Sequence, residues 1–189
     1  MGKVVVTEFI SIDGVIEDPG GAEDFDRGGW AFEFERGEEG DKFKFDEVVE
    51  AEAHLLGRVT FEGFAAAWPS REGEFADMFN KMPKYVVSST LSDPEWENST
   101  VLSGDAAEEV AKLKDEIDGV LLVAGSAQLV NTLVDNDLVD ELRLMVFPTV
   151  LGAGKRLFEK TGAAKSLRLV DSKPAGECTI LTFEPKAKE

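Results

Sequence analysis

The stretch formed by residues 119–158 constrains the fold most, because it holds two apolar segments that each end in a glycine-containing turn. Residues 120–123 are all apolar, and the run is short enough for a strand that is buried on both faces. It ends at Ala124-Gly125-Ser126, small residues that let the backbone turn tightly and approach a ligand. Leu129, Val130, Leu133 and Val134 then recur at helical spacing.

A strand, a small-residue turn and a helix N-terminus together favour anion binding, because free backbone N–H groups and the helix dipole point the same way. The second apolar segment, residues 142–147, passes through Pro148 into Gly152-Ala153-Gly154, another loop that permits close approach. Two such strand ends within one βαβ-like unit predict a nucleotide cleft.

Length and charge limit the classes of protein that fit. A chain of 189 residues predicts one domain, residues 1–189, with 43% apolar residues to build its core. The formal charge of −18 argues against a nucleic-acid partner and against binding to anionic membranes. The acidic residues are spread along the chain, which is typical of a solvated surface, and a salty habitat stays an open alternative.

The cysteine content and the apolar runs bear on location. Cys178 is the one cysteine, so no internal disulfide can form, and its alternating surroundings predict a small residue within a strand. We find no apolar run near 20 residues and no signal-peptide pattern at the start of the sequence. The expectation is a soluble, cytoplasmic protein.

The remaining periodicity alternates between strands and helices. Residues 3–10 are rich in β-branched side chains and predict a strand, followed by a turn at Asp13-Gly14. The acidic, glycine-rich loop at 17–40 carries Trp30, Phe32 and Phe34, aromatic residues that either pack the loop down or line a pocket. Further helices are expected at 41–53, after Arg58, at 74–82 and after a capping box formed by Asp105 and Glu108, and further strands at 54–57, 84–88, 166–170 and 178–183, with 173–176 as a hairpin loop.

The predicted fold class is therefore α/β, with a central, mostly parallel, twisted sheet, helices on both faces and an antiparallel C-terminal pair of strands. Ligands bind at the carboxyl ends of the strands in such sheets. Three ends carry suitable groups: Gly57-Arg58-Val59-Thr60, Ser88-Ser89-Thr90 and Ala124-Gly125-Ser126. Together they are suited to a phosphorylated dinucleotide, with the Arg58 guanidinium on a terminal phosphate, unless Arg58 pairs with one of the many acids.

Other common sites find little support. The sequence has neither G-x-G-x-x-G nor a Walker A pattern. His54 is the only histidine, no further metal ligands are spaced near it, and no G-x-S-x-G motif accompanies it. A structural role for His54 is favoured over metal binding or hydrolysis, and we predict no metal site.

Six motifs in order resemble those of the dihydrofolate-reductase-like superfamily, and most closely those of the stand-alone relatives of the reductase domain of bacterial riboflavin biosynthesis. They are Ser11-x-Asp13-Gly14-x-Ile16, Leu56-Gly57-Arg58-x-Thr60-Phe61-Glu62, Val87-Ser88-Ser89-Thr90, Ala124-Gly125-Ser126, Leu138-Val139-Asp140-Glu141-Leu142 and Pro148-x-x-Leu151-Gly152-x-Gly154-x-x-Leu157-Phe158. The resemblance covers nearly the whole chain. It implies a sheet of about eight strands, NADPH as cofactor and a homodimer.

The resemblance also assigns residues to the cofactor. Gly57, Arg58, Val59 and Thr60, with the hydroxyls of Ser88, Ser89 and Thr90, would meet the 2′-phosphate end. Ala124, Gly125, Ser126, Ala127 and Gln128 would lie along the diphosphate and nicotinamide, and Asp13, Gly14 and Ile16 would border the nicotinamide and the substrate. The chain departs from the family pattern at Ala124 and Ser126, where many relatives have a run of glycines, and the methyl and hydroxymethyl groups leave less room for the backbone to approach the phosphates.

On the substrate side, the resemblance implies a buried carboxylate on the helix before the Gly-Arg motif. Counting back from Arg58 reaches Asp41, with Phe45 one turn later, and makes Asp41 the candidate acid beside Asp13. Trp30 and Phe147 are the other candidates for substrate contact. Basic groups near the site are sparse, with Lys155 and Arg156 the nearest, which disfavours a phosphorylated substrate.

The leading hypothesis is an NADPH-dependent reductase acting on a C=N or C=O carbon of a small heterocycle, such as a pterin or aminopyrimidine, or of a carbonyl compound. Protonation would come from water or from a carboxyl group of raised pKa such as Asp41. The alternatives are true dihydrofolate reduction and a non-catalytic nucleotide-binding protein that retained the fold.

Overall fold

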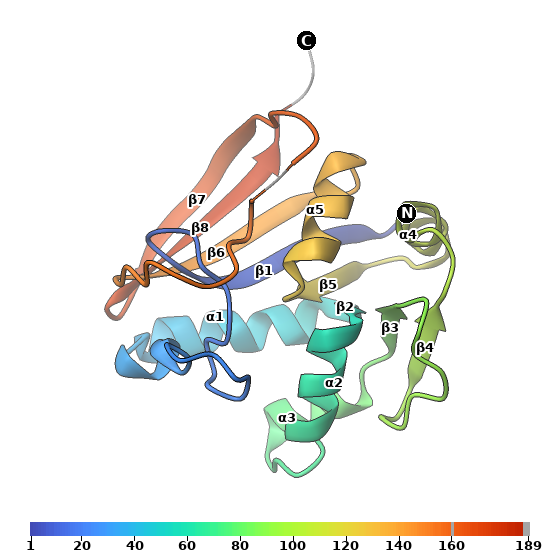
Figure 1. The fold of residues 1–189 in the computed structure, drawn as a ribbon, viewed down its shortest axis with the longest axis horizontal. Coiled ribbons are helices and arrows are strands. Elements are labelled where there is room, and N and C mark those ends of the chain that lie inside the picture. The colour runs from blue at the N-terminus through green and yellow to red at the C-terminus, as the bar shows by residue number, and fades with distance from the viewer. Residues whose placement is uncertain (160, 187–189) are drawn as a thin grey trace.

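Eight strands form one sheet in the order β4-β3-β2-β5-β1-β6-β8-β7 in the computed structural model, which describes residues 1–159 and 161–186 (Figure 1). The strands are β1 (Lys3–Ser11), β2 (Ala51–Gly57), β3 (Lys84–Val87), β4 (Ser99–Leu102), β5 (Val120–Ala124), β6 (Glu141–Phe147), β7 (Leu167–Ala175) and β8 (Cys178–Pro185). The helices are η1 (Trp30–Glu33), a 3-10 turn, and α1 (Gly37–Glu50), α2 (Arg58–Ala67), α3 (Glu74–Lys81), α4 (Ala106–Glu116) and α5 (Ala127–Asp135).

The predicted fold class is confirmed. Strands β1 to β6 run parallel to one another, and β8 pairs antiparallel with both β6 and β7. In Figure 1 the blue strand β1 lies in the middle of the sheet, between β5 and β6. The carboxyl ends of β1, β2, β3, β5 and β6 therefore share one edge of the sheet, which is where the predicted cofactor-binding turns lie.

Three boundaries differ from the sequence prediction. Helix α1 starts at Gly37 and ends at Glu50, because Ala51 and Ala53 enter β2, where Ala53 is buried. Strand β7 continues through Lys173 and Pro174 to Ala175, so the hairpin turn lies at Gly176 and Glu177 rather than at 173–176. Strand β4 was not expected, because its four residues are only partly buried or exposed.

Helices cover both faces of the sheet. Helices α4 and α5 pack Val110, Leu113 and Leu133 against one face, where they meet inward side chains of β1 and β5. On the other face, α1, α2 and α3 contribute Val48, Phe61 and Phe79 to a second cluster, together with Leu56 and Val86. Below we call these the α5 face and the α1 face. Among the described residues, no helix is long and apolar enough to cross a membrane.

The aromatic residues of the acidic loop fold it onto the sheet. Trp30 is 2% exposed, its indole Nε1 donates to the carbonyl of Glu17 at 2.9 Å, and its ring meets Phe147 edge-on with centroids 5.3 Å apart. Phe34 packs on the same Phe147 ring, while Phe32 is exposed. Trp30 and Phe34 therefore pack the loop down onto the sheet, which is one of the two alternatives that the sequence left open.

Two buried polar residues, His54 and Lys84, lie on the α1 face. His54 is fully buried beside Phe79, and burial together with Lys84 lowers the pKa of its imidazole to about 3, so the ring is neutral. Lys84 pairs with His54 in the sheet, and its Nζ donates to the carbonyls of Asn80, Met82 and Glu97. These contacts agree with a structural role for His54.

Candidate functional site

The loops after β2 and β5 meet at the carboxyl edge of the sheet. Because β2 and β5 are neighbours in parallel register, the turns that follow them lie side by side. A Cβ atom at Gly57 would come within 2.7 Å of the Cβ of Ser126, and one at Gly125 within 2.9 Å of Thr60 Oγ1. Each turn therefore needs a glycine to admit a side chain of the other. We call residues 57–60 and 124–126 the paired turns.

Both paired turns open into helix N-termini. Helix α2 starts at Arg58 after the N-cap Gly57, which has no side chain to satisfy the first N–H groups. At α5 the N-cap is Ser126, in a left-handed conformation with φ 65°, and its Oγ accepts a hydrogen bond from the N–H of Leu129. Two helix N-termini with open N–H groups thus lie at adjacent strand ends, an arrangement that favours the binding of anions.

The cation beside the paired turns is already paired. Nη1 of Arg58 donates to both carboxylate oxygens of Glu62, at 3.0 and 2.9 Å, and both side chains are exposed. The structure thus shows Arg58 paired with an acid, the alternative that the sequence left open. An exposed pair of this kind is worth only about 0–1 kcal/mol, so a phosphate dianion can compete for the guanidinium.

The three hydroxyl-bearing residues that follow β3 have two different roles. Ser88 is buried, and its Oγ accepts hydrogen bonds from the N–H groups of Thr90 and Leu91, at 3.2 and 3.0 Å. Ser89 and Thr90 are exposed on that turn. Ser88 therefore shapes the turn, while Ser89 and Thr90 carry the hydroxyls that a ligand can reach.

Asp13 joins the loop after β1 to the loop after β6. Its Oδ1 accepts from Ser11 Oγ at 2.7 Å and from the N–H of Leu151 at 3.0 Å, and its Oδ2 accepts from the N–H of Gly152 at 2.7 Å. The hydrogen bond from Ser11, then those from the backbone, lower the pKa of this carboxyl to about 2. An ionised, fully bonded carboxylate is a poor proton donor at neutral pH, so these contacts favour a role for Asp13 in shaping the site.

The same loops border the positions predicted for the nicotinamide. The N–H of Leu157 donates to the carbonyl of Gly14, and the N–H of Ile16 donates to the carbonyl of Lys155, both at 2.9 Å. Gly14 has φ 83°, a left-handed value that favours glycine. Arg156 also donates, through Nε, to the carbonyl of Asp13. Arg156, one of the two basic residues after Gly154, therefore serves partly to hold this loop.

The position of Asp41 corrects the expectation of a buried carboxylate there. Its side chain is 65% exposed and accepts a hydrogen bond from Arg36 Nε at 2.5 Å. The helix turns Gly40, Glu47 and Val48 toward the sheet, which leaves Asp41 outside. Phe45 is partly buried and lies 6.5 Å from Phe75 between ring centroids.

A charged layer lies between α1 and the sheet instead. Glu47 is 2% exposed; its Oε2 accepts from Thr7 Oγ1 at 3.0 Å and pairs with Lys44 Nζ at 2.6 Å. Lys44 Nζ also donates to Thr7 Oγ1 at 2.8 Å and lies 5.2 Å from the centroid of the Phe9 ring. Arg143 of β6 closes the layer, pairing with Glu141 and Glu50 and lying 3.7 Å from Glu47. An ammonium, a hydroxyl and a carboxylate thus adjoin an aromatic ring.

Glu8 lies one residue further along β1 and points to the opposite face. Its Oε1 accepts a hydrogen bond from the N–H of Gly125 at 3.0 Å, and the residue is 7% exposed. Burial raises the pKa of this carboxyl to about 8, although the Gly125 N–H and, more weakly, Lys44 oppose the shift. Glu8 is therefore protonated at neutral pH, directly beneath one of the paired turns.

Comparison with known proteins identifies the family. The model of the RibD C-terminal domain matches residues 2–181. The chain belongs to the RibD C-terminal domain family. It is 31% identical to the Bacillus subtilis (strain 168) protein YwjB over 183 residues, which cover 96% of this chain and 97% of YwjB. A second B. subtilis protein, YyaP, is 28% identical over 177 residues, or 90% of this chain and 88% of YyaP.

Solved structures show the same fold for this RibD C-terminal domain. A Shewanella sp. PV-4 protein named for riboflavin biosynthesis aligns with a TM-score of 0.78 at 20% identity, covering 98% of this chain and 99% of that one. Dihydrofolate reductase from Enterococcus faecalis, complexed with NADP(H), aligns with a TM-score of 0.59 at 18% identity over 98% and 97% of the two chains. These structures confirm the expected dihydrofolate-reductase-like fold, and the family match confirms the resemblance to the reductase domain of riboflavin biosynthesis.

The structure brings residues 57–60 and 124–126 of the predicted cofactor site into contact, but it does not bring the predicted substrate residues to an open pocket. Trp30 and Phe147 are 2% and 1% exposed and belong to one core cluster, so the structure gives them to the core rather than to an open pocket. Sequence reasoning missed Glu8, Lys44 and Glu47. One signal was present, since Glu8 is the one acidic residue of a mostly apolar strand.

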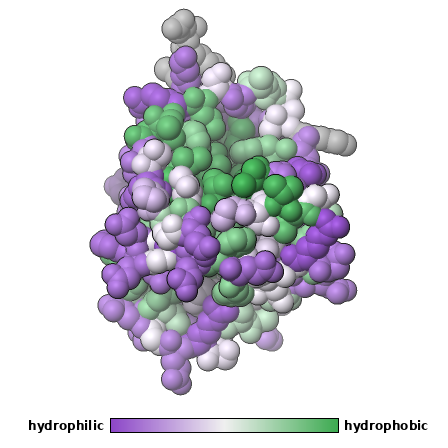
Figure 2. Space-filling view, turned by 90° about the vertical axis from the view of Figure 1, so that its left-hand side faces the viewer, coloured by the Kyte–Doolittle hydropathy of each residue, from purple (hydrophilic) through white to green (hydrophobic). Residues whose placement is uncertain are grey.

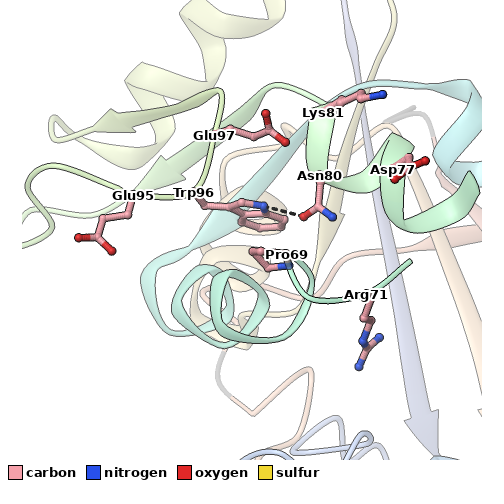
Figure 3. A pocket seen from close by; sticks show the side chains of 8 residues that line it. All are labelled: Pro69, Arg71, Asp77, Asn80, Lys81, Glu95, Trp96 and Glu97. Atoms are coloured by element: carbon pink, nitrogen blue, oxygen red, sulfur yellow. Dashed lines mark hydrogen bonds between the residues drawn. The ribbon is translucent and has the colours of Figure 1, made fainter. Parts of the chain in front are cut away.

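Two cavities flank α2 and α3, and the second is lined by Glu62, the partner of Arg58, and by Leu91, which follows Thr90. One of about 370 Å³ separates α3 from the segment before β4, where Trp96 Nε1 donates to Asn80 Oδ1 (Figure 3). It adjoins residues that precede β3 and β4, at the opposite edge of the sheet from the paired turns. Another of about 520 Å³ lies between α2 and the segment 91–96. Among the described residues, no group of three His, Cys, Asp or Glu could hold a metal ion.

Proposed function

We propose that this protein is an NADPH-dependent reductase that transfers hydride to an electron-poor C=N or C=O carbon of a small heterocyclic or carbonyl substrate, in the pterin or aminopyrimidine class. The observation that carries the proposal is the pair of interlocked turns, where Gly57 and Gly125 bring two open helix N-termini together. Membership of the RibD C-terminal domain family and the NADP(H) complex of a protein of the same fold support it.

Each part of the cofactor has a proposed contact. Arg58, Ser89 and Thr90 would bind the 2′-phosphate, with Val59 and Thr60 beside them and Ser88 holding the turn. Residues 124–128 would bind the diphosphate, and Gly14 and Ile16 would border the nicotinamide. The fit rests on the open N–H groups at the starts of α2 and α5, which the close contact at Gly57 and Gly125 holds side by side. NADPH would supply the hydride, while the protein orients the reactants and excludes water.

The charged layer beneath α1 is the proposed substrate side. Lys44 Nζ offers a donor to a carbonyl oxygen or ring nitrogen held near the Phe9 ring, and Thr7 Oγ1 and Glu47 keep Lys44 in place. True dihydrofolate reduction is less well supported, because the carboxylate expected at Asp41 is exposed and paired with Arg36. Water remains the proposed proton source, with Lys44 orienting it.

The cofactor half is tested by titrating the protein with NADPH and with NADH by calorimetry. We expect tighter binding of NADPH, and a loss of at least tenfold in NADPH affinity, with NADH unchanged, in Arg58→Ala. The matched control is Arg168→Ala, which also removes an exposed arginine paired with a glutamate. Glu62→Gln frees Arg58 and should raise NADPH affinity. Equal affinities for both cofactors would refute the role of Arg58, and no binding of either would refute the proposal.

Turnover is tested by following loss of NADPH absorbance over a panel of pterins, aminopyrimidines and carbonyl compounds. Turnover that Lys44→Met abolishes, with NADPH affinity retained, would support the substrate side. Cofactor binding without turnover on the whole panel would favour the non-catalytic alternative. The Ser126 side chain gives that alternative some weight, because it occupies space beside Gly57.

We also propose a homodimer, through strand β7 at the edge of the sheet. Leu167, Leu169 and Val170 of β7 are 42%, 53% and 50% exposed. Figure 2 shows apolar surface gathered on the upper part of the side where β7 and β8 lie. Light scattering should give twice the mass of the chain, and Leu169→Lys should return it to the monomer. A cytoplasmic location stays a prediction.

A further inference from the structure

Glu8 is a buried carboxyl that the proposed reaction does not use. It lies in β1 next to β5, and its only hydrogen bond in the described chain is the one it accepts from the N–H of Gly125, 117 positions away in the sequence. Gly125 and Ser126 have φ of 75° and 65°, so the turn above Glu8 consists of two consecutive left-handed residues. A turn of this uncommon conformation persists only where the surrounding groups hold it in place.

The direction of Glu8 separates it from the substrate side. Side chains alternate along a strand. Thr7 and Phe9 contact the layer beneath α1, while Glu8 lies with Val6 and Ile10 on the α5 face. The sheet therefore stands between the Glu8 carboxyl and Lys44. A role in protonating a substrate on the α1 face does not fit this arrangement, whereas a role beneath the diphosphate turn does.

We infer that Glu8 is a positioning residue that holds the Gly125-Ser126 turn in its diphosphate-binding shape, and that its carboxyl must be uncharged for the cofactor to bind. This inference rests on the proposed function. An uncharged carboxyl accepts the Gly125 hydrogen bond and leaves the field of the α5 N-terminus to the diphosphate. A carboxylate in the same place would offset the positive potential of the α5 N-terminus and would repel the diphosphate.

Few charged groups around Glu8 could compensate the negative charge that it would carry when ionised. Lys44, on the other side of the sheet, is the charged group in the described chain that acts on it, and it lowers the pKa. The neighbouring residue in β6 is Leu144, and the first two turns of α5, residues 127–134, carry no charged side chain. On the β2–α2 side, His54 is neutral and Arg58 is paired with Glu62. Ionisation near pH 8 would therefore change the charge beneath the turn by one unit.

The test is NADPH affinity between pH 7.5 and 9.5 for the wild type, Glu8→Gln and Glu8→Ala. The 2′-phosphate is fully ionised over this range, since phosphate monoesters have a pKa near 6. We expect wild-type affinity to fall up to tenfold per pH unit above pH 8, with uptake of about one proton on binding at pH 9. Glu8→Gln keeps an acceptor for Gly125 and cannot ionise, so its affinity should match the wild type at pH 7.5 and stay flat.

Comparison of the wild type with Glu8→Gln isolates Glu8 from other groups that titrate in this range, such as Lys84, whose pKa is lowered to about 8. Glu8→Ala loses the acceptor and should bind at least tenfold more weakly at every pH; if it does not fold, Glu8→Gln decides alone. Parallel pH profiles for the wild type and Glu8→Gln would overturn the inference and leave the proposed function standing. No NADPH binding by either protein at any pH would overturn both.

Discussion

Replacing Asp13 with asparagine tests how the loops around the site are held. The Asp13 carboxylate accepts hydrogen bonds from Ser11 Oγ and from the N–H groups of Leu151 and Gly152. All three donors are fixed by the folded chain, and two of them belong to a loop almost 140 positions away. Asparagine has the same shape but one acceptor oxygen, and its NH₂ group must face at least one of these donors.

The size of the effect follows from those bonds. A hydrogen bond to a charged group contributes about 1.5–3 kcal/mol, and an unsatisfied donor costs about 1–3 kcal/mol. Asp13→Asn loses one bond and weakens two, so we expect a loss of about 2–4 kcal/mol in the free energy of unfolding at pH 7. The direction in which this stabilisation changes with pH also follows from the pKa. Because the folded pKa lies near 2 and the reference value is 3.8, this stabilisation is complete above about pH 4 and disappears as the pH falls toward 2.

Urea unfolding at pH 7, 4 and 2.5, followed by tryptophan fluorescence, measures both effects. The gap between the wild type and Asp13→Asn should be largest at pH 7 and should narrow at pH 2.5. Asp46→Asn is the matched control, because Asp46 is 56% exposed and makes only a surface pair with Lys42. A gap below about 0.5 kcal/mol at pH 7, or one that does not change with pH, would refute the role given to Asp13.

Three further predictions concern stability. Burial raises the pKa of Glu8 from 4.5 to about 8, so the protonated carboxyl stabilises the folded state fully below pH 4.5 and this stabilisation is lost as the pH rises to 8. Relative to Glu8→Gln, the free energy of unfolding of the wild type, measured with urea, should fall by up to roughly 5 kcal/mol across that window. A difference between the two proteins that does not change with pH would contradict this. Lys84→Met leaves the carbonyls of Asn80, Met82 and Glu97 without their donor and should cost about 2–4 kcal/mol in the same assay, whereas a neutral result would show that water replaces the ammonium. A formal charge of −18 implies self-repulsion, so Tm should rise between about 0.05 and 1 M NaCl, and a falling Tm would argue that attractive pairs dominate.

The strand ends could be predicted because they depend on local properties of the sequence. An apolar run, a small-residue turn and a helical stripe specify residues 120–134 without knowledge of the rest of the chain. The sequence left open that Arg58 pairs with an acid, and the structure identifies the partner as Glu62, four positions later on the same helix. The meeting of Gly57 with Ser126 was not, because it depends on which strands are neighbours in the sheet.

The substrate side could not be predicted because the inward face of α1 is not marked by hydrophobicity. Apolar and charged residues alternate along this helix without one clear stripe, so the sequence does not tell Asp41 from Glu47. The inward position of Glu47 is set by its contacts with Thr7 and Lys44. Likewise, Trp30 lies in the core because Phe147, more than one hundred positions later, completes its packing.

The contact between the paired turns also has a consequence for how this family can change over evolutionary time. Gly57 has φ −78°, a value open to any residue, so what bars alanine at this position is the Ser126 side chain rather than the backbone. Gly57→Ala should therefore be tolerated in a Ser126→Gly background and harmful without it. Positions 57 and 126 are then expected to covary among relatives, with a side chain permitted at one only where the other is glycine, and the order of the two substitutions decides which lineages remain functional.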